Sequence, residues 1–478
     1  MAETADSEER TGRLAAHRQV LAALALAQFI CSFAGSNMNV MINDISRDLG
    51  TTVQGVQVAI TVFLLVMAAL MIPGGKLTDR WGRKRCFRAG LIIYAVGALL
   101  SAAAPGLAVL IVGNSILEGI GTALLIPPVY ILTTLLYRDV TSRARAFGVI
   151  MTSGGIGAAA GPLIGGLITA GIGWRAAFVF QALVIAVIVL LSSRLDDPLP
   201  PDPGRPFDIG GAVLSAVGLV LVVMGILAAH LNLWLTFGLM VLGALVLLWF
   251  FCRIRVRERS GREPLLSLAL FRDRTSNLGL ITQYVQWLML MGTSFTVAAY
   301  LQVVRHYNAI GTGLVLTAAT LGLLVTSLGA ERFAERRPQR TLIVAGFVVA
   351  IAGVAVMIVP AGSSTNAWAH VPGLLLFGLG LGVMLTPSVN VVQSSFPEDR
   401  QGEISGLSRS VSNLGSSCGT AIAGTILVSG LTRGAYAAAL ITLAAIGLVG
   451  LAAASRLPPT TGPYMTRSTG RGRDSSGA

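Results

Sequence analysis

The chain has 478 residues, of which 54% are hydrophobic and only 12% are charged, and its mean hydropathy is +0.75. This composition excludes an ordinary soluble protein and indicates a polytopic membrane protein. The net charge of +13 does not indicate nucleic-acid binding, because the basic residues are spread over alternate loops instead of gathering on one soluble arm. The four cysteines form no Cys-x-x-Cys pair and no cluster with histidine, so neither a disulfide framework nor a metal site is expected.

Fourteen apolar runs follow one another along the chain, each about 20 residues long, which is the length that crosses a bilayer as a helix. The first run is too long for the apolar core of a signal peptide and is followed by no clear cleavage site, so it is interpreted as a retained helix. An even number of spans places both chain ends on one side of the membrane. The runs begin near Val20, Val56, Phe87, Leu107, Ala146, Ala176, Ile209, Leu233, Asn277, Gly311, Thr341, Val371, Glu403 and Ala435.

The distribution of basic residues predicts on which side of the membrane the two chain ends lie. Nearly all lysines and arginines, with Arg409 counted among them, fall on the side of the amino terminus. Only Arg47, Arg175, Arg305 and Arg433 fall on the other side. Because cytoplasmic loops carry an excess of Lys and Arg, both ends are predicted to be cytoplasmic.

A dense basic segment joins the second and third runs: Gly75-Lys-Leu-Thr-Asp79-Arg80-Trp81-Gly82-Arg83-Lys84-Arg85. Its single acid stands among five cations, and its glycines permit a tight turn. The segment resembles motif A of the major facilitator superfamily at every defined position. The resemblance implies an all-α fold of two six-helix bundles. It also implies a cytoplasmic gate that includes Gly75, Asp79, Arg80, Gly82, Arg83, Lys84 and Arg85, with Asp79 placed at the start of the helix near Gly402 and Glu403.

Glu118 lies about halfway along the fourth run, between stretches of apolar and small residues. A carboxylate at that depth costs several kcal/mol to insert, so we expect it to face a water-filled cavity and to carry the coupling proton. The alternative is a protonated acid that only hydrogen-bonds between helices. The superfamily's motif B has arginine and glutamine where this chain has Ser115 and Glu118, and Ala34 stands where the fourteen-spanner branch has an acid. These departures leave the coupling stoichiometry in doubt.

The fifth run resembles motif C, the antiporter motif of the superfamily, which marks exporters that exchange substrate for protons. Glycines spaced by four give a smooth face for close helix packing, and Pro162 removes a backbone hydrogen bond and bends the helix. The alternative is a plain glycine-rich packing face. The motif residues are Gly148, Gly157, Gly161, Pro162, Gly165 and Gly166.

The resemblance extends from Val20 to Leu457 and divides the chain into segments. The entry to the seventh run, residues 207–214, resembles the extra helix pair of the fourteen-spanner drug:proton antiporters, and residues 331–340 resemble a decayed second copy of motif A. The predicted segments are a cytoplasmic stretch (1–19), the first six-helix bundle (20–192), a Pro-rich cytoplasmic linker (193–208), two extra helices (209–251), an Arg-rich cytoplasmic loop (252–276), the second six-helix bundle (277–455) and a disordered tail (456–478).

Uncharged polar residues supply the predicted substrate cavity. Amides, aromatic rings and a single acid suit a bulky, apolar or cationic ligand better than a sugar or a dianion. The same residues can instead be hydrogen-bonding links between helices. The candidates are Gln28, Ser32, Asn39, Asn114, Gln283, Gln286, Trp287 and Asn390.

The sequence therefore predicts a transporter and not an enzyme. The expected activity is proton-driven export of amphipathic or cationic small molecules, such as drugs or antibiotics, by alternating access in the plasma membrane. The chain contains no Walker A sequence, so the proton gradient is expected to supply the energy without a cofactor. The expected partners of this monomer are the bilayer, the substrate and protons. The alternatives are an exporter of an endogenous metabolite, siderophore or lipid, and a transport-inactive membrane sensor or scaffold.

Overall fold

The computed structural model of the chain describes residues 2–137, 140–195, 197, 200–204, 206–230, 232–363, 366–396 and 400–459. Within its helices, the side chains of residues 2–17, 140, 141, 144, 159, 194, 230, 328, 330–336, 361–363, 401 and 402 lie outside this description. The second copy of motif A and the tail beyond Pro459 therefore fall largely outside the described residues. The described part of the chain is helical and contains no strand.

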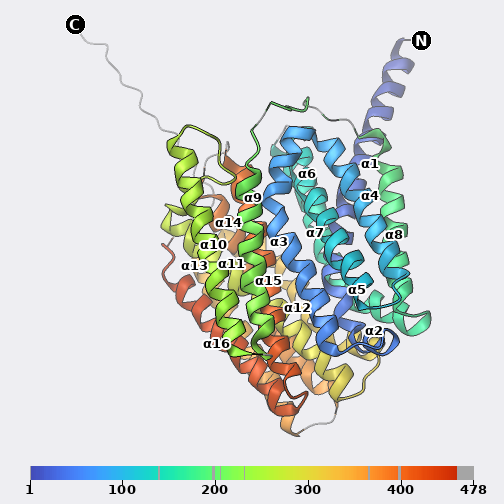
Figure 1. Cartoon of the computed structure of the whole chain (residues 1–478). Coiled ribbons are helices and arrows are strands. Elements are labelled where there is room, and N and C mark those ends of the chain that lie inside the picture. The colour runs from blue at the N-terminus through green and yellow to red at the C-terminus, as the bar shows by residue number, and fades with distance from the viewer. Residues whose placement is uncertain are drawn as a thin grey trace.

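The first half of the chain forms one bundle, drawn in blue and cyan (Figure 1). Its fourth span is continuous from α5 through a π-helical segment, η2, into α6. A backbone surrounded by lipid must satisfy its own hydrogen bonds, which is why each apolar run folds as a helix. The elements are α1 (Ala2–Asn37), α2 (Ile42–Asp48), α3 (Val53–Trp81), α4 (Arg83–Ala102), α5 (Leu107–Leu110), η2 (Ile111–Glu118), α6 (Gly119–Leu136), α7 (Val140–Gly171) and α8 (Trp174–Leu191).

The second half forms the other bundle, drawn in yellow to red (Figure 1), and the extra pair α9 and α10 is drawn in green. The elements are α9 (Ile209–Leu227), α10 (Leu233–Arg259), η5 (Leu268–Phe271), α11 (Arg274–Ala299), η6 (Tyr300–Val304), α12 (Ala309–Arg336), α13 (Gln339–Ser363), α14 (Val371–Gln393), α15 (Gln401–Val428) and α16 (Arg433–Ser455).

The number of membrane-length helices agrees with the prediction. Thirteen helices of the described residues are long and apolar enough to cross a membrane. A fourteenth is counted when the two arms of α7, residues 145–158 and 160–171, are taken as one span bent by 43°. The predicted all-α fold with fourteen spans is thus confirmed.

Two boundaries differ from the prediction. Helix α10 continues to Arg259, so residues 252–259 are helical and do not belong to the loop predicted at 252–276. Basic residues in the last turn of a helix interact favourably with its carboxyl-terminal dipole, which stabilises this extension into water. Helix α1 similarly begins at Ala2, well before the first apolar run.

The two bundles meet along two seams, one between α3 and α15 and the other between α7 and α12. Side chains hydrogen-bond to the opposite backbone along the first seam. The Gln57 side chain donates to Ala421 O (3.1 Å), and the Ser417 hydroxyl donates to Thr61 O (3.0 Å). At the second seam, Gly313 packs against the Pro162 carbonyl. The small side chains at these contacts allow the helix backbones to approach closely.

The end of the molecule that carries the α3–α4 turn, the α10–α11 loop and the start of α15 is called the basic end here. The other end carries α2, where Asp48 accepts hydrogen bonds from Arg175 and from the Trp174 indole (3.0 Å) of α8. These contacts, that of Arg175 first, lower the pKa of the Asp48 carboxyl. Burial has the opposite effect on the neighbouring Asp44 and raises its pKa.

These two aspartates are expected to affect acid stability with opposite signs. The folded-state pKa of Asp48 is below the unfolded value of about 3.9. Its contacts therefore stabilise the fold above that pH, and this stability is lost as the pH falls through the folded-state pKa. Asp48→Asn should lower the thermal midpoint at pH 7 and flatten its decline in acid. Asp44→Asn should raise the midpoint at pH 7. Thermal unfolding in detergent between pH 3 and 8 measures both, and equal shifts in the two variants would contradict the assignment.

Candidate functional site

Glu118 is the last residue of the π-helical segment η2. Such segments inside α-helices are frequent at functional sites. The side chain is 0% exposed, and neither carboxylate oxygen has a hydrogen-bond partner within the described residues. Tyr94 and Ser101 of α4 are its polar neighbours. An ion without a partner is costly to bury, so this environment favours the neutral acid.

The prediction that Glu118 faces a water-filled cavity is wrong for this conformation. The side chain lies beside Tyr94 and Ser101 of α4, and Gly97, which has no side chain, lets η2 approach the α4 backbone closely. Tyr94 continues the polar cluster by donating to Gln181 Oε1 of α8 at 2.5 Å. Three further buried polar atoms nearby along these helices lack partners among the described residues, namely Asn114 Nδ2, Thr122 Oγ1 and Gln181 Nε2. Unsatisfied buried groups of this kind mark places where water enters or partners change.

A second polar cluster joins the two bundles. The Tyr130 hydroxyl of α6 donates to Gln28 Oε1 of α1 (3.0 Å), and Gln28 Nε2 donates to Ser32 (3.2 Å). From the other bundle, Arg409 of α15 hydrogen-bonds to the same hydroxyl, with its guanidinium 4.6 Å from the Tyr130 ring centroid. Cys31 of α1 lies near both Glu118 and Arg409.

The sequence groups Arg409 with the basic residues on the side of the amino terminus, but it is not a loop residue. It lies inside the candidate span that runs from Glu403 to Val428. The sequence signal that identifies it is a single cation between small and apolar residues of a membrane-length helix, since such residues face the protein interior or a cavity. Tyr130 gave no comparable signal.

The predicted cavity residues do not form one group. Gln283 and Gln286 donate to the α14 backbone at Ser388 O (3.0 Å) and Leu381 O (3.3 Å), so these two amides link helices within the second bundle. The Asn39 carbonyl accepts from Gln302 (2.6 Å) at the end opposite the basic end. Gln28 and Ser32 belong to the Tyr130 cluster, and Asn114 is buried inside the first bundle. Trp287 and Asn390 are half-buried.

Motif C places α7 between α1 and α12. A side chain at Gly157 would collide with the Phe29 carbonyl of α1, and one at Gly161 with Ser36. Gly165 faces Asn37 of α1, whereas Gly166 faces the Ala309 carbonyl of α12. Gly148 faces open space. The bend of α7 falls between Ala158 and Ala160, immediately before Pro162.

Motif A forms the turn at the basic end. Gly82 has φ +95°, a conformation that favours glycine. Asp79 pairs with Arg83 (3.2 Å) within the turn, and Asp197 accepts from the backbone N–H of Arg83 (2.6 Å). The predicted position of Asp79 at the start of α15, near Gly402 and Glu403, stays a prediction, since the side chains of residues 401 and 402 lie outside the described residues.

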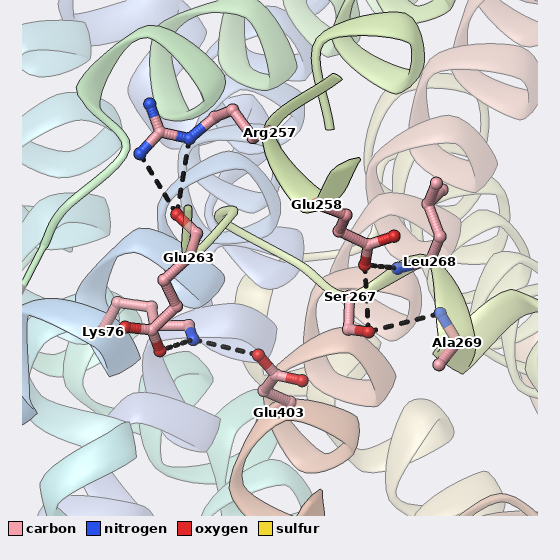
Figure 2. A network of polar contacts seen from close by, with 8 residues as sticks. All are labelled: Lys76, Arg257, Glu258, Glu263, Ser267, Leu268, Ala269 and Glu403. Carbon is pink, nitrogen blue, oxygen red and sulfur yellow. Dashed lines mark hydrogen bonds and ion pairs between the residues drawn. The ribbon is translucent and has the colours of Figure 1, made fainter. Parts of the chain in front are cut away.

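Lys76 connects the two bundles at this end (Figure 2). Its ammonium pairs with Glu403 of α15 at 2.9 Å and with Glu263 of the α10–α11 loop at 3.2 Å. The Glu263 carbonyl in turn accepts from Arg257 of α10 (3.1 Å), and Arg257 pairs with the buried Asp208 before α9 (3.4 Å). Sequence reasoning missed Lys76 because its partners lie 187 and 327 residues away.

The Lys76–Glu403 pair is expected to show a coupling energy of about 1 kcal/mol, the upper range for exposed pairs, because Lys76 is only 14% exposed. Lys76→Gln, Glu403→Gln and the double variant form the double-mutant cycle, read from thermal stability in nanodiscs. Glu263→Gln in the same cycle reports the second arm of the bridge. Additive effects of Lys76→Gln and Glu403→Gln would show that the pair does not hold the bundles together.

The sequence matches one protein family over most of its length. The model of the Major Facilitator Superfamily matches residues 24–214 and 207–420. The puromycin resistance protein pur8 of Streptomyces alboniger is 31% identical over 416 residues, which cover 85% of this chain and 81% of that protein. The multidrug efflux pump LfrA of Mycolicibacterium smegmatis is 29% identical over 372 residues, covering 77% of this chain and 73% of that protein.

Two further comparisons agree with these. The probable actinorhodin transporter of Streptomyces coelicolor is 29% identical over 402 residues, covering 82% of this chain and 69% of that protein. Among solved structures, the peptide transporter POT in complex with sulfate superposes with a TM-score of 0.67, covering 92% of this chain and 95% of that chain. At 19% sequence identity this likeness shows a shared fold alone.

Proposed function

The chain belongs to the major facilitator superfamily, and from this premise we propose that it exports amphipathic small molecules of the drug or antibiotic type in exchange for protons. It is a multi-pass membrane transporter and not an enzyme. We propose further that it is a monomer of the fourteen-spanner drug:proton antiporter branch. Both of its ends would lie in the cytoplasm, so that the basic end is the cytoplasmic end.

One observation carries the proposal of proton coupling. Among the candidate spans of the described residues, Glu118 is the only Asp or Glu that lies away from the helix ends. It is fully buried without a hydrogen-bond partner. Acids at such a depth are expensive to insert and typically form part of proton relays. The relatives named for drug resistance and efflux support the direction of transport.

The polar cluster suggests how a proton moves. The neutral acid is favoured while Glu118 is enclosed by α4, Tyr94 and the first bundle. Release requires water or a positive charge to reach the carboxyl, and we assign this role to Arg409, which lies inside a candidate membrane span. A substrate that displaces Arg409 from Tyr130 would bring this charge into play, so substrate binding and proton release would be linked.

Arg409 also supports a second candidate function. A guanidinium at the seam attracts acidic ligands and repels simple cations. Export of an acidic endogenous metabolite therefore remains as the alternative cargo. A panel of cationic, neutral and acidic amphiphiles distinguishes a drug-type cargo from an acidic metabolite.

The experiment is proton release from the purified protein in weakly buffered detergent after each ligand is added. We expect saturable release of protons with the cognate ligand class, together with uptake of that ligand into inside-out vesicles that carry a proton gradient. Uptake should stop when the gradient is collapsed by a protonophore. Folded protein that neither releases protons nor transports any member of the panel would contradict the proposal and favour the sensor alternative.

A further inference from the structure

A cavity of about 440 Å³ lies at the basic end, between the last turns of α10 and the η5 segment. The walls come from both elements. Arg255 and Arg259 are one helical turn apart on α10, and Arg272 follows η5 on the facing side. Leu268 and Phe271 form the apolar part of the lining, and Glu258 completes it.

The three guanidinium groups have no ion-pair or hydrogen-bond partner within the described part of the chain. The acid in the lining is already engaged: Glu258 accepts from Leu268 N (2.7 Å) and from the Ser267 hydroxyl (3.1 Å), which fixes the start of η5 on α10 (Figure 2). Like charges at a spacing of four residues on a helix repel each other. The cavity therefore combines a surplus of positive charge with a fixed wall, and an anion would relieve the repulsion.

The cavity continues into a surface suited to lipid. The outward side of α10 exposes Leu248 and Phe251 before the arginines by 60% and 38%, and Val256 between Arg255 and Arg259 by 64%. A ligand that fits both parts carries an anionic head and apolar chains. Basic pockets at the cytoplasmic ends of membrane helices bind anionic headgroups, and the guanidinium fork matches the geometry of phosphate oxygens.

We propose that the cavity lined by Arg255, Arg259 and Arg272 binds the phosphate of an anionic phospholipid headgroup. The site lies between α10 of the extra helix pair and the η5 segment, and it is separate from the Glu118 and Arg409 clusters. It shares the α10–α11 loop with Glu263, the partner of Lys76. A bound headgroup would hold this loop in the arrangement that keeps Lys76 between Glu263 and Glu403.

The chain offers its own probe for the test. Of the four cysteines, only Cys252 is exposed, and it lies three residues before Arg255 on α10. The full chain, labelled at Cys252 with a small fluorophore, is placed in nanodiscs that contain phosphatidylcholine and a fixed fraction of phosphatidylglycerol. In one preparation the phosphatidylcholine carries brominated chains, and in the other the phosphatidylglycerol does. Brominated chains quench the fluorophore on contact.

We expect brominated phosphatidylglycerol to quench more strongly than brominated phosphatidylcholine at the same mole fraction. Each arginine should contribute about a fivefold preference, the equivalent of about 1 kcal/mol per basic residue at a membrane surface. Arg255→Gln with Arg259→Gln and Arg272→Gln should abolish the preference. The matched control removes the same charge from exposed arginines outside the cavity, through Arg18→Gln, Arg262→Gln and Arg337→Gln, and should retain it. Equal quenching by both lipids in the wild type, or equal loss in both triple variants, would overturn the proposal.

A second arm separates a lipid from a soluble phosphate. Millimolar inorganic phosphate or glycerol 3-phosphate should leave the quenching by phosphatidylglycerol unchanged at constant ionic strength, because neither has chains to contact α10. Complete displacement of the lipid by these solutes would overturn the assignment to a phospholipid and indicate a soluble phosphate site.

Discussion

Glu118→Gln is expected to abolish proton-coupled export while the protein still folds and binds its substrate. A membrane potential of about 100 mV supplies about 2.3 kcal/mol per proton, which sustains a gradient of about fiftyfold in a neutral substrate. Glutamine has nearly the shape of the neutral acid but holds no transferable proton. The substrate gradient across proteoliposomes should therefore fall to about one, and ligand-induced proton release should disappear.

Two further measurements separate coupling from structure. Exchange of labelled for unlabelled substrate needs no net proton movement, so Glu118→Gln should retain it. The thermal midpoint of Glu118→Gln should equal that of the wild type, since the variant leaves no buried carboxylate without a partner. Ser101→Ala, which alters a neutral neighbour on α4, is the matched control and should keep the gradient. A Glu118→Gln protein that still builds the full gradient would place the coupling proton at another group.

Gly157→Ala is expected to separate α1 from α7 and to destabilise the first bundle by about 1 to 3 kcal/mol, the usual range for overpacking. The added methyl would meet the Phe29 carbonyl, and it would lie 3.0 Å from the carbonyl carbon and 3.1 Å from the Cα atom of that residue. These are backbone atoms of a helix, so no side chain can move aside. Thermal unfolding in nanodiscs and the transport rate should both decline.

Gly148→Ala is the matched control within the same motif, because no atom lies within 4 Å of the new methyl. Alanine is about 1 kcal/mol more favourable than glycine inside a helix, so this variant should be neutral or slightly more stable. The contrast between two identical substitutions distinguishes the packing role of motif C from a general intolerance to change in α7. Equal effects of Gly157→Ala and Gly148→Ala would refute the packing role of motif C.

The sequence predicted what depends on local pattern. Apolar runs identified the spans, since each is set by the length of the bilayer, and the spacing of Gly157, Gly161 and Gly165 placed three glycines on one face that contacts α1. The partners of those helices could not be read in the same way. Arg409 and Tyr130 are 279 residues apart, and Lys76 and Glu403 are 327 apart. Such pairings depend on how the two bundles dock, and no local pattern encodes that docking.

Glu118 shows what the sequence leaves undetermined at a single position. Its depth in the fourth run identified it as an unusual acid, but the choice between a cavity wall and the bundle interior depends on its rotation about the helix axis. The π-helical turn of η2 changes that rotation by inserting one residue per bulge. A regular helical wheel drawn on the sequence therefore misplaces the residues after Ile111.

The position of α9 bears on how a membrane-dissolved compound reaches the protein. Helix α9 contacts both α3 and α15, so it covers the outside of the seam between them. The other seam, between α7 and α12, has no comparable helix laid over it within the described residues. A compound that partitions into the bilayer before it is captured therefore finds the seam between α3 and α15 covered by α9 and the seam between α7 and α12 uncovered. Entry from the lipid would then be one-sided, along the seam between α7 and α12.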